Sequence, residues 1–165
     1  MPAKVEAYLR KHIPLSAGMD ITVLEASLSR VSIEVPLPPN RNHQSTAFGG
    51  SVAALAILTG WTLVHLRLKS EGLITHTVIQ SSTVQYNLPI KGTFKAVAEG
   101  VADKVWQRFT HTLARRGKGR VHVTVNLQSE GEVAASFEGA YVAISGKENP
   151  ETFEAPCSPK PGTAR

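Results

Sequence analysis

The stretch PLPPNRNHQSTAFGGSVAALAILTGW, residues 36–61, decides the fold. A turn rich in Pro and Asn runs into Gly49-Gly50 and then into a long apolar segment, which predicts one helix over residues 51–68. Apolar residues occupy nearly every face of that helix, so it should be buried on several sides. Its first turn should present unpaired N–H groups at an electropositive end, where two glycines allow a ligand close to the backbone.

The same region lacks carboxylates. No Asp or Glu occurs between Glu34 and Glu71. An active site built at the start of this helix would therefore work without a local carboxylate base.

The segments around the helix predict a single antiparallel sheet. Alternating apolar and polar residues, rich in β-branched types, predict strands over 21–28, 30–36, 75–86, 93–100, 120–128 and 133–145. Residues 3–12 should form a short amphipathic helix, and residues 103–115 a second helix or an irregular connection. In the second segment Asp103 is a candidate cap, and Trp106, Phe109 and Leu113 form an apolar stripe. One helix wrapped by six strands is the α+β hotdog architecture.

Composition indicates one domain. The 165 residues are 42% hydrophobic and 19% charged, which is ordinary for a globular protein that buries a core. We expect the hotdog domain over residues 1–145 and a disordered tail over 146–165, a segment rich in Pro, Glu, Ser and Gly. The start resembles no signal peptide, the apolar helix is too interrupted for a membrane span, and Cys157 has no second cysteine. These features favour a cytoplasmic location and no membrane partner.

Several spaced motifs carry a family resemblance. The segments PLPPNRNHQSTAFGGS, LTGW and VQYNLP are similar to the YiiD C-terminal-type hotdog family, and the likeness covers roughly residues 3–145. That family contains proteins described as thioesterases and also malonyl-acyl-carrier-protein decarboxylases, which make the acetyl primer for fatty acid synthesis. The resemblance implies a thioester substrate carried by acyl carrier protein or coenzyme A, and no cofactor.

The missing carboxylate bears on the choice of reaction. Thioesterases of this general kind often carry an Asp or Glu one or two turns past the Gly-Gly pair, where it activates water. Here those positions are the apolar residues 53–58, so hydrolysis lacks its base. Decarboxylation of a malonyl thioester needs no base, only donors that stabilise an enolate oxygen and an apolar setting for the departing carboxylate. We therefore expect a decarboxylase, with an acyl thioesterase and a non-catalytic carrier-binding module as alternatives.

Three residues are the candidate catalytic set. Asn42, Thr46 and the backbone at Gly50 offer hydrogen-bond donors beside the helix start. Asn42 could instead cap the helix or stabilise the turn, Thr46 could be an ordinary loop hydroxyl, and the glycines could simply allow close packing. Asn40, which follows two prolines, is expected to shape the loop.

Four further residues are candidates for lining the substrate. His43 is a candidate proton donor to the enolate, although a loop histidine is commonly just solvated. Phe48 offers an apolar wall and Gly49 a close backbone approach. Tyr86 in QYNLP matches a substrate-lining strand end of the family, and a core tyrosine is the other interpretation. The remaining histidines lack metal-ligand spacing, so no metal is expected.

The protein has a net charge of +5, and its clearest basic cluster lies over residues 115–120. Arg115, Arg116, Lys118 and Arg120 alternate with Gly117 and Gly119. This basic cluster is either a solvated hairpin approach or a site for the phosphate of a pantetheine arm, with glycine N–H groups as extra donors. It lacks interleaved aromatic residues, so nucleic acid is not the expected partner.

Exposed sheet edges favour self-association. Hotdog domains commonly bury an edge by pairing two copies, so we expect a homodimer or a dimer of dimers. In such an assembly, Glu99 or Asp103 from the other subunit could supply the carboxylate that hydrolysis requires.

Overall fold

The computed structural model describes residues 1–146. These residues include the whole segment expected to form the hotdog domain. The tail expected from Gly146 onward lies, apart from Gly146 itself, outside the described residues.

The described chain contains four α-helices, one 3-10 turn and six strands. In order they are α1 (Pro2–His12), α2 (Pro14–Gly18), β1 (Thr22–Ala26), β2 (Arg30–Val35), η1 (Pro38–Asn40), α3 (Gly49–Ser70), β3 (Thr75–Tyr86), β4 (Phe94–Glu99), α4 (Asp103–Arg116), β5 (Lys118–Ser129) and β6 (Glu132–Ser145). The expected strands are all present, and residues 103–116 are helical rather than irregular. The sequence pattern missed α2 and η1, which are a single turn or so each and have too few residues to show a period.

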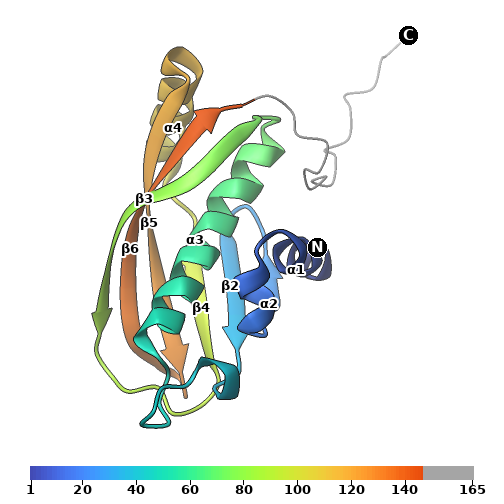
Figure 1. Cartoon of the computed structure of the whole chain (residues 1–165). Coiled ribbons are helices and arrows are strands. Elements are labelled where there is room, and N and C mark those ends of the chain that lie inside the picture. Colours follow the sequence, from blue (N-terminus) through green and yellow to red (C-terminus); the bar gives the residue numbers. More distant parts are fainter. Residues whose placement is uncertain (147–165) are drawn as a thin grey trace.

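The six strands form one antiparallel sheet in the order β1-β2-β4-β5-β6-β3. Figure 1 shows this sheet curving around α3, which runs along its concave side. The domain is therefore an α+β hotdog fold, as expected. β3 forms one edge of the sheet and pairs through its length with β6.

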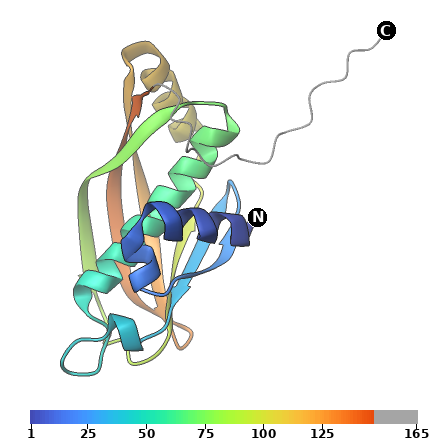
Figure 2. The same ribbon diagram turned by 45° about the vertical axis from the view of Figure 1, so that its right-hand side comes forward.

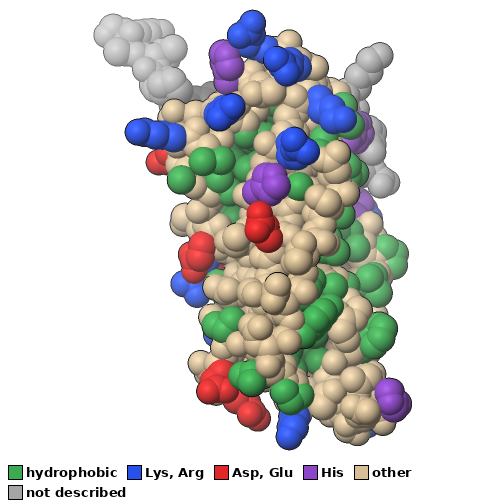
Figure 3. Space-filling view, turned by 90° about the vertical axis from the view of Figure 1, so that its left-hand side faces the viewer, with side chains coloured by type: hydrophobic (Ala, Val, Ile, Leu, Met, Phe, Trp, Pro, Cys, Tyr) green, Lys and Arg blue, Asp and Glu red, His purple; other side chains and the backbone are tan. Residues whose placement is uncertain are grey.

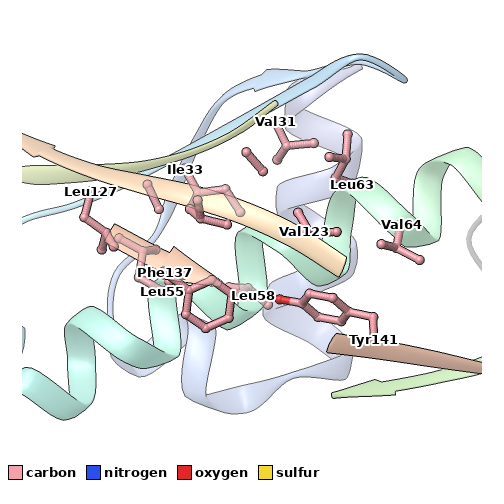
Figure 4. Packing of buried hydrophobic residues seen from close by; sticks show 14 of the residues in the cluster. Val31, Ile33, Leu55, Leu58, Leu63, Val64, Val123, Leu127, Phe137 and Tyr141 are labelled. Atoms are coloured by element: carbon pink, nitrogen blue, oxygen red, sulfur yellow. The ribbon is translucent and has the colours of Figure 1, made fainter. Parts of the chain in front are cut away.

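The core lies between α3 and the concave face of the sheet. Leu55, Leu63 and Val64 of α3 meet Val123 and Phe137 from the sheet, and all five side chains are almost fully buried (Figure 4). Such side chains each contribute roughly 1.5–3 kcal/mol on leaving water. α3 is long and apolar enough to cross a membrane by composition, yet 61% of its apolar window is buried inside the domain. Most of this apolar window is thus covered inside the domain.

Tyr141 of the sheet packs against the middle of α3 and bonds to its backbone. The hydroxyl of Tyr141 on β6 donates to the carbonyl of Ile57 at 2.8 Å, and its ring packs directly against Gly60. Any side chain at Gly60 would collide with that hydroxyl. Burial raises the pKa of Tyr141, so the hydroxyl stays protonated and remains a donor.

The N-terminal helices cover the flank of α3 next to β1 and β2 (Figures 1 and 2). Rings from α1 and α3 stack there: His65 lies 4.5 Å from Trp61 and 5.6 Å from Tyr8, measured between ring centroids. Burial, with a smaller contribution from nearby Lys69, lowers the pKa of His65 to about 4. His65 is therefore a neutral packing residue at ordinary pH.

The C-terminal end of α3 is tied to α4. Arg67 donates to the carbonyl of Val101 at 2.7 Å, pairs with Asp103 at 2.9 Å and lies over the Trp106 ring. The prediction that Asp103 caps α4 is wrong, because Ala102 is the N-cap residue and the Asp103 side chain turns to Arg67. The stripe of Trp106, Phe109 and Leu113 is buried, as expected.

Candidate active site at the start of the central helix

The loop that leads into α3 is anchored by a buried asparagine. The Asn40 amide nitrogen donates to the carbonyls of Met19 and Pro36 at 2.9 and 2.8 Å, and the Asn40 carbonyl accepts from the N–H of Phe48 at 2.7 Å. These bonds tie both ends of the loop to one point. The expectation that Asn40 shapes the loop is confirmed.

Asn42 and Thr46 are brought together, and they are bonded to each other. The Asn42 amide nitrogen donates to the Thr46 hydroxyl at 2.9 Å. The Asn42 side-chain oxygen accepts from the N–H groups of Gln44 and Thr46 at 2.8 and 3.2 Å. This is the pattern of an asparagine that organises a turn. In this protomer the Asn42 amide is engaged within the loop.

The helix start presents free donors. The N-cap residue of α3 is Phe48, whose hydrocarbon side chain cannot accept a hydrogen bond from the first turn. The N–H of Val52 bonds back to the Phe48 carbonyl at 3.1 Å. The backbone N–H groups of Gly49, Gly50 and Ser51 precede that first helical bond, so they are the donors that a ligand would meet.

A pocket of about 520 Å³ opens beside this helix start. Its walls come from the loop before α3, from α3, from the end of β3 with the segment that follows it, and from β6. The lining residues are Ala47, Gly49, Gly50, Val52, Tyr86, Asn87, Leu88, Pro89, Ile90 and Ala135. None of these ten side chains is a carboxylic acid. The pocket is therefore mostly apolar, with a phenol, an amide and backbone N–H groups as its polar elements.

Three of the sequence candidates lie in this pocket. Gly49, Gly50 and Tyr86 line it, and the Tyr86 hydroxyl donates to the Gly49 carbonyl at 3.0 Å. The Tyr86 side chain is 57% exposed, so it is not a core residue in the isolated protomer. A side chain at Gly50 would collide with the ring of Phe48, whereas one at Gly49 would make an ordinary 3.5 Å contact with Tyr86.

The other loop candidates lie around the pocket rather than in its wall. Asn42, His43 and Thr46 are outside the lining set, and His43 is exposed on the loop. Phe48 is 56% exposed, with its ring against Gly50. Their assigned roles remain predictions.

Sequence reasoning missed one polar residue of the pocket, Asn87. It follows Tyr86 at the end of β3, and its backbone N–H bonds to the Ala134 carbonyl at 2.9 Å, which fixes this turn against β6. Its side chain is exposed in the pocket lining. Asn87 lies in the QYNLP motif beside Tyr86. The motif was assigned to substrate lining through Tyr86 alone, because aromatic rings commonly line substrate sites.

The basic cluster lies at the opposite end of the molecule. Arg115 and Arg116 end α4, and Lys118 and Arg120 begin β5. In Figure 3 the Lys and Arg side chains gather at the upper end of this face, which is the α4 end of Figure 1. α3 has 22 residues and so spans about 33 Å, which separates its pocket end from its α4 end. Within one protomer, the structure does not bring the basic cluster to the pocket.

The two glycines of that cluster have structural roles. Gly117 has a φ of 67° and ends α4, with its N–H donated to the Leu113 carbonyl at 2.8 Å. Gly119 is buried against Phe109, with no room for a Cβ. The prediction that these glycines offer backbone donors to a phosphate is therefore wrong for Gly117, whose donor is used.

Solved structures of similar shape share this architecture. A protein of unknown function from Chlorobaculum tepidum TLS superposes with a TM-score of 0.81 at 23% identity, over 88% of this chain and 94% of that one. A "putative thioesterase" from Shewanella oneidensis has a TM-score of 0.76 at 26% identity, over 87% of this chain and 96% of that one. A Pseudomonas aeruginosa protein of unknown function, titled "probable thioesterase", has a TM-score of 0.75 at 21% identity, over 88% and 97% of the two chains.

The family comparison covers almost the whole described domain. The model of the family described as "Putative thioesterase (yiiD_Cterm)" matches residues 2–145. The match includes the loop, the helix start and the pocket segment after β3. The chain therefore belongs to the YiiD C-terminal family, the hotdog proteins described as thioesterases.

Proposed function

We propose that this protein is a malonyl-acyl-carrier-protein decarboxylase, whose product, acetyl-acyl-carrier protein, primes fatty acid synthesis. The observation that carries the proposal is the pocket at the start of α3, whose ten lining residues include no carboxylic acid. A family of thioester-acting proteins supplies the substrate class, and the pocket chemistry supports the reaction within that class.

The proposed reaction needs hydrogen-bond donors from the helix start and apolar surroundings from the pocket. The bond between the malonyl carboxylate and the neighbouring carbon breaks, carbon dioxide leaves, and the electron pair moves into the thioester to form an enolate. The N–H groups of Gly50 and Ser51, together with the Asn87 amide, are suitable donors to the enolate oxygen. Val52, Leu88 and Ile90 provide the apolar surroundings in which a carboxylate readily becomes neutral carbon dioxide. A proton from water, or from His43 at the loop, completes acetyl formation.

Asn42 takes a positioning role in this proposal. Its amide is bonded to the Thr46 hydroxyl and to two backbone N–H groups, so it fixes the loop that carries Phe48 to the helix start. Direct donation by Asn42 would require the bond to Thr46 to open. The Gly50 and Ser51 backbone donors need no such rearrangement.

Thioester hydrolysis is the second candidate, and the family description favours it. It requires a group that activates water. The two carboxylates considered for that role from a second subunit, Glu99 and Asp103, are paired with Arg30 at 3.4 Å and with Arg67 at 2.9 Å. Each carboxylate is thus already paired with an arginine of its own subunit, and activating water in a partner's pocket would compete with that pair.

We also propose that β3 pairs with β3 of a second copy. β3 is a 12-residue edge strand, and the side chains over residues 80–83 are exposed and small or polar. A long, unprotected edge of this kind is a template for pairing with another strand. Antiparallel pairing about a two-fold axis would give a continuous sheet across the homodimer.

One product assay separates the candidate functions. The protein is incubated with malonyl-acyl-carrier protein, and the carrier is analysed by mass spectrometry. Acetylated carrier as the main product supports decarboxylation. Free thiol carrier without acetylated carrier indicates hydrolysis, and unchanged malonyl carrier that nevertheless binds indicates a non-catalytic module.

The same assay with malonyl-coenzyme A gives the carrier preference. Higher kcat/KM for the carrier-linked substrate is the expected result. Light scattering of the protein, and of a Ser81→Lys variant, tests the dimer. Ser81 lies at the middle of β3, where two copies of a new charge would face each other across the axis and weaken the pairing.

A further inference from the structure

One exposed face of α4 carries three cationic side chains and a histidine. Lys104, Arg108, His111 and Arg115 follow the spacing of one helix face and are all exposed. The opposite face buries Trp106, Phe109 and Leu113 against the domain. We call these four residues the α4 stripe.

The charge pattern of the stripe is costly for an isolated helix. Like charges four residues apart, as at Lys104 and Arg108, disfavour a helix. Cations near the start of a helix are also disfavoured by its dipole. The single acidic residue of α4, Asp103, is turned to Arg67 and does not offset the stripe. A row of like charges disfavours the helix that carries it, but the same row can attract a partner surface of opposite charge.

The stripe is far from the pocket of its own subunit. The end of α4 adjoins the start of β3, because Gly146 bonds to the Ile74 carbonyl at 3.0 Å and Ser145 to the Gly117 carbonyl at 2.9 Å. The pocket lies at Tyr86, the other end of β3. Eleven residue steps of a strand separate these ends, about 36 Å at ~3.3 Å per residue.

Pairing of two β3 strands removes that separation. In an antiparallel pair, the Thr75 end of one strand lies beside the Tyr86 end of the other. The start of β5 is two strands from β3, through Lys118 opposite Ile144 and Ile144 opposite His76. Three strand spacings, about 14 Å, then separate the α4 end of one subunit from the pocket end of its partner.

We propose that the α4 stripe docks the acidic surface of the carrier protein and delivers its thioester arm to the pocket of the partner subunit. This inference rests on the proposed function and on the proposed dimer, and it adds the docking surface and the direction of delivery. Carriers of this class are acidic, so the charges are complementary.

The surface suits a protein better than a nucleic acid. The stripe spans twelve residues of helix, about 16 Å, which matches about three turns of a partner helix. Val105, which is 50% exposed, adds an apolar contact beside the cations. Aromatic side chains that would stack on bases are buried here, because Trp106 and Phe109 face the core.

A charge-reversal variant tests the docking surface. In Lys104→Glu/Arg108→Glu the carboxylate at 104 lies in the first turn of α4, where the helix dipole favours it, and the one at 108 replaces another exposed charge, so the fold should be retained. The KM for malonyl-acyl-carrier protein is expected to rise at least tenfold at low salt, with kcat nearly unchanged. The kinetics on a malonyl thioester of pantetheine alone should be unaffected.

Lys4→Glu/Lys11→Glu is the matched control. Both lysines are exposed on α1, and the double change alters the net charge by the same amount. Its KM for the carrier substrate should stay within about twofold of the parent. An equal rise in KM in both variants would mean a general charge effect and would overturn the proposed surface.

The outcomes keep the two proposals apart. If the parent protein decarboxylates neither malonyl thioester, the proposed function fails. If it decarboxylates both and Lys104→Glu/Arg108→Glu retains the parent KM on the carrier, the proposed function stands and the docking surface is wrong. Stripe-dependent binding of a DNA duplex, without binding of the carrier, would also overturn it.

A mixed dimer tests delivery to the partner subunit. One subunit carries Gly50→Asp, which blocks its pocket, and the other carries Lys104→Glu/Arg108→Glu. Delivery across the dimer pairs the intact stripe of the first subunit with the intact pocket of the second, so the carrier substrate should be turned over with the parent KM. Turnover only at the raised KM would show that stripe and pocket act within one subunit.

Discussion

The two ends of α3 differ in almost every chemical respect. At its start the pocket is apolar, carboxylate-free and supplied with backbone donors. At its end Arg67, Trp106 and Glu71 form a tight network, with the Trp106 indole donating to the Glu71 carboxylate at 2.5 Å. Beyond that network lies the cationic α4 stripe. One end thus offers hydrogen-bond donors in an apolar setting, and the other end presents exposed positive charge.

The strongest test of the pocket end is Gly50→Asp. The new carboxylate would occupy the first turn of α3, use the N–H donors meant for the enolate and repel the malonyl carboxylate. Acetyl-carrier formation should fall by about a thousandfold, while thermal unfolding stays near the parent value. The Phe48 ring must turn aside, and its 56% exposure permits this. Retained activity would remove the helix start from the mechanism.

Acid should destabilise the fold through the ring stack between α1 and α3, which lies away from the pocket residues. The pKa of His65 is lowered to about 4 in the folded protein and is near 6.5 in an unfolded chain. The unfolded state therefore binds more protons between these values, and stability is lost as the pH falls from 6.5 towards 4. His65 alone should account for about 3 kcal/mol by pH 4.

His65→Phe isolates that contribution. Phenylalanine keeps the ring between Trp61 and Tyr8 but does not titrate. The free energy of unfolding in urea should fall between pH 7 and pH 4 in both proteins. The fall should be about 3 kcal/mol smaller in the variant than in the parent. Parallel losses in both proteins would place the acid sensitivity elsewhere.

Two substitutions of Asn42 decide how it acts. Asn42→Ala removes the bonds that hold the loop and should lower kcat by about a hundredfold. Asn42→Asp keeps an acceptor for the N–H groups of Gln44 and Thr46, and the Thr46 hydroxyl can then donate to it. The Asp variant should keep most of the activity. If it loses as much as the Ala variant, Asn42 is a direct donor to the enolate after all.

The smallest expected effects concern the contacts that Arg67 makes between α3 and α4. Arg67→Met removes the bond to the Val101 carbonyl and the contact of a cation with Trp106, and should cost about 2 kcal/mol in unfolding free energy. Asp103→Asn removes an exposed partner and should cost less than about 1 kcal/mol. Urea denaturation measures both. Equal costs would mean that the ion pair with Asp103, rather than the bond of Arg67 to the Val101 carbonyl, holds α4.

Much of the fold was predictable from local pattern. The buried helix over residues 51–68 and the alternating strands are periodic, and a period is a property of neighbours along the chain. The observed helix runs from Gly49 to Ser70, so only its ends were displaced. α2 and η1 were missed because a single turn has no period to detect.

The candidate site was predicted less completely. The pairing of Gly49-Gly50 with Tyr86 in one pocket agrees with the motifs that suggested them. Asn87 was overlooked, and the basic cluster of Arg115 to Arg120 turned out to lie at the far end of the domain. Residue types indicate which chemistry is available, but not which side chains share a cavity.

The sequence by itself determined the hotdog fold, the family and the absence of a carboxylate from the start of the central helix. These follow from residue identity and short-range spacing. Only the tertiary structure decided that the Asn42 amide is engaged with Thr46, that Asn87 enters the pocket, and that α4 presents its cations some 36 Å from the pocket of its own subunit. The reason is physical: a hydrogen-bond partner or a distance between sites depends on how separate elements pack, and packing brings together residues that the chain keeps apart.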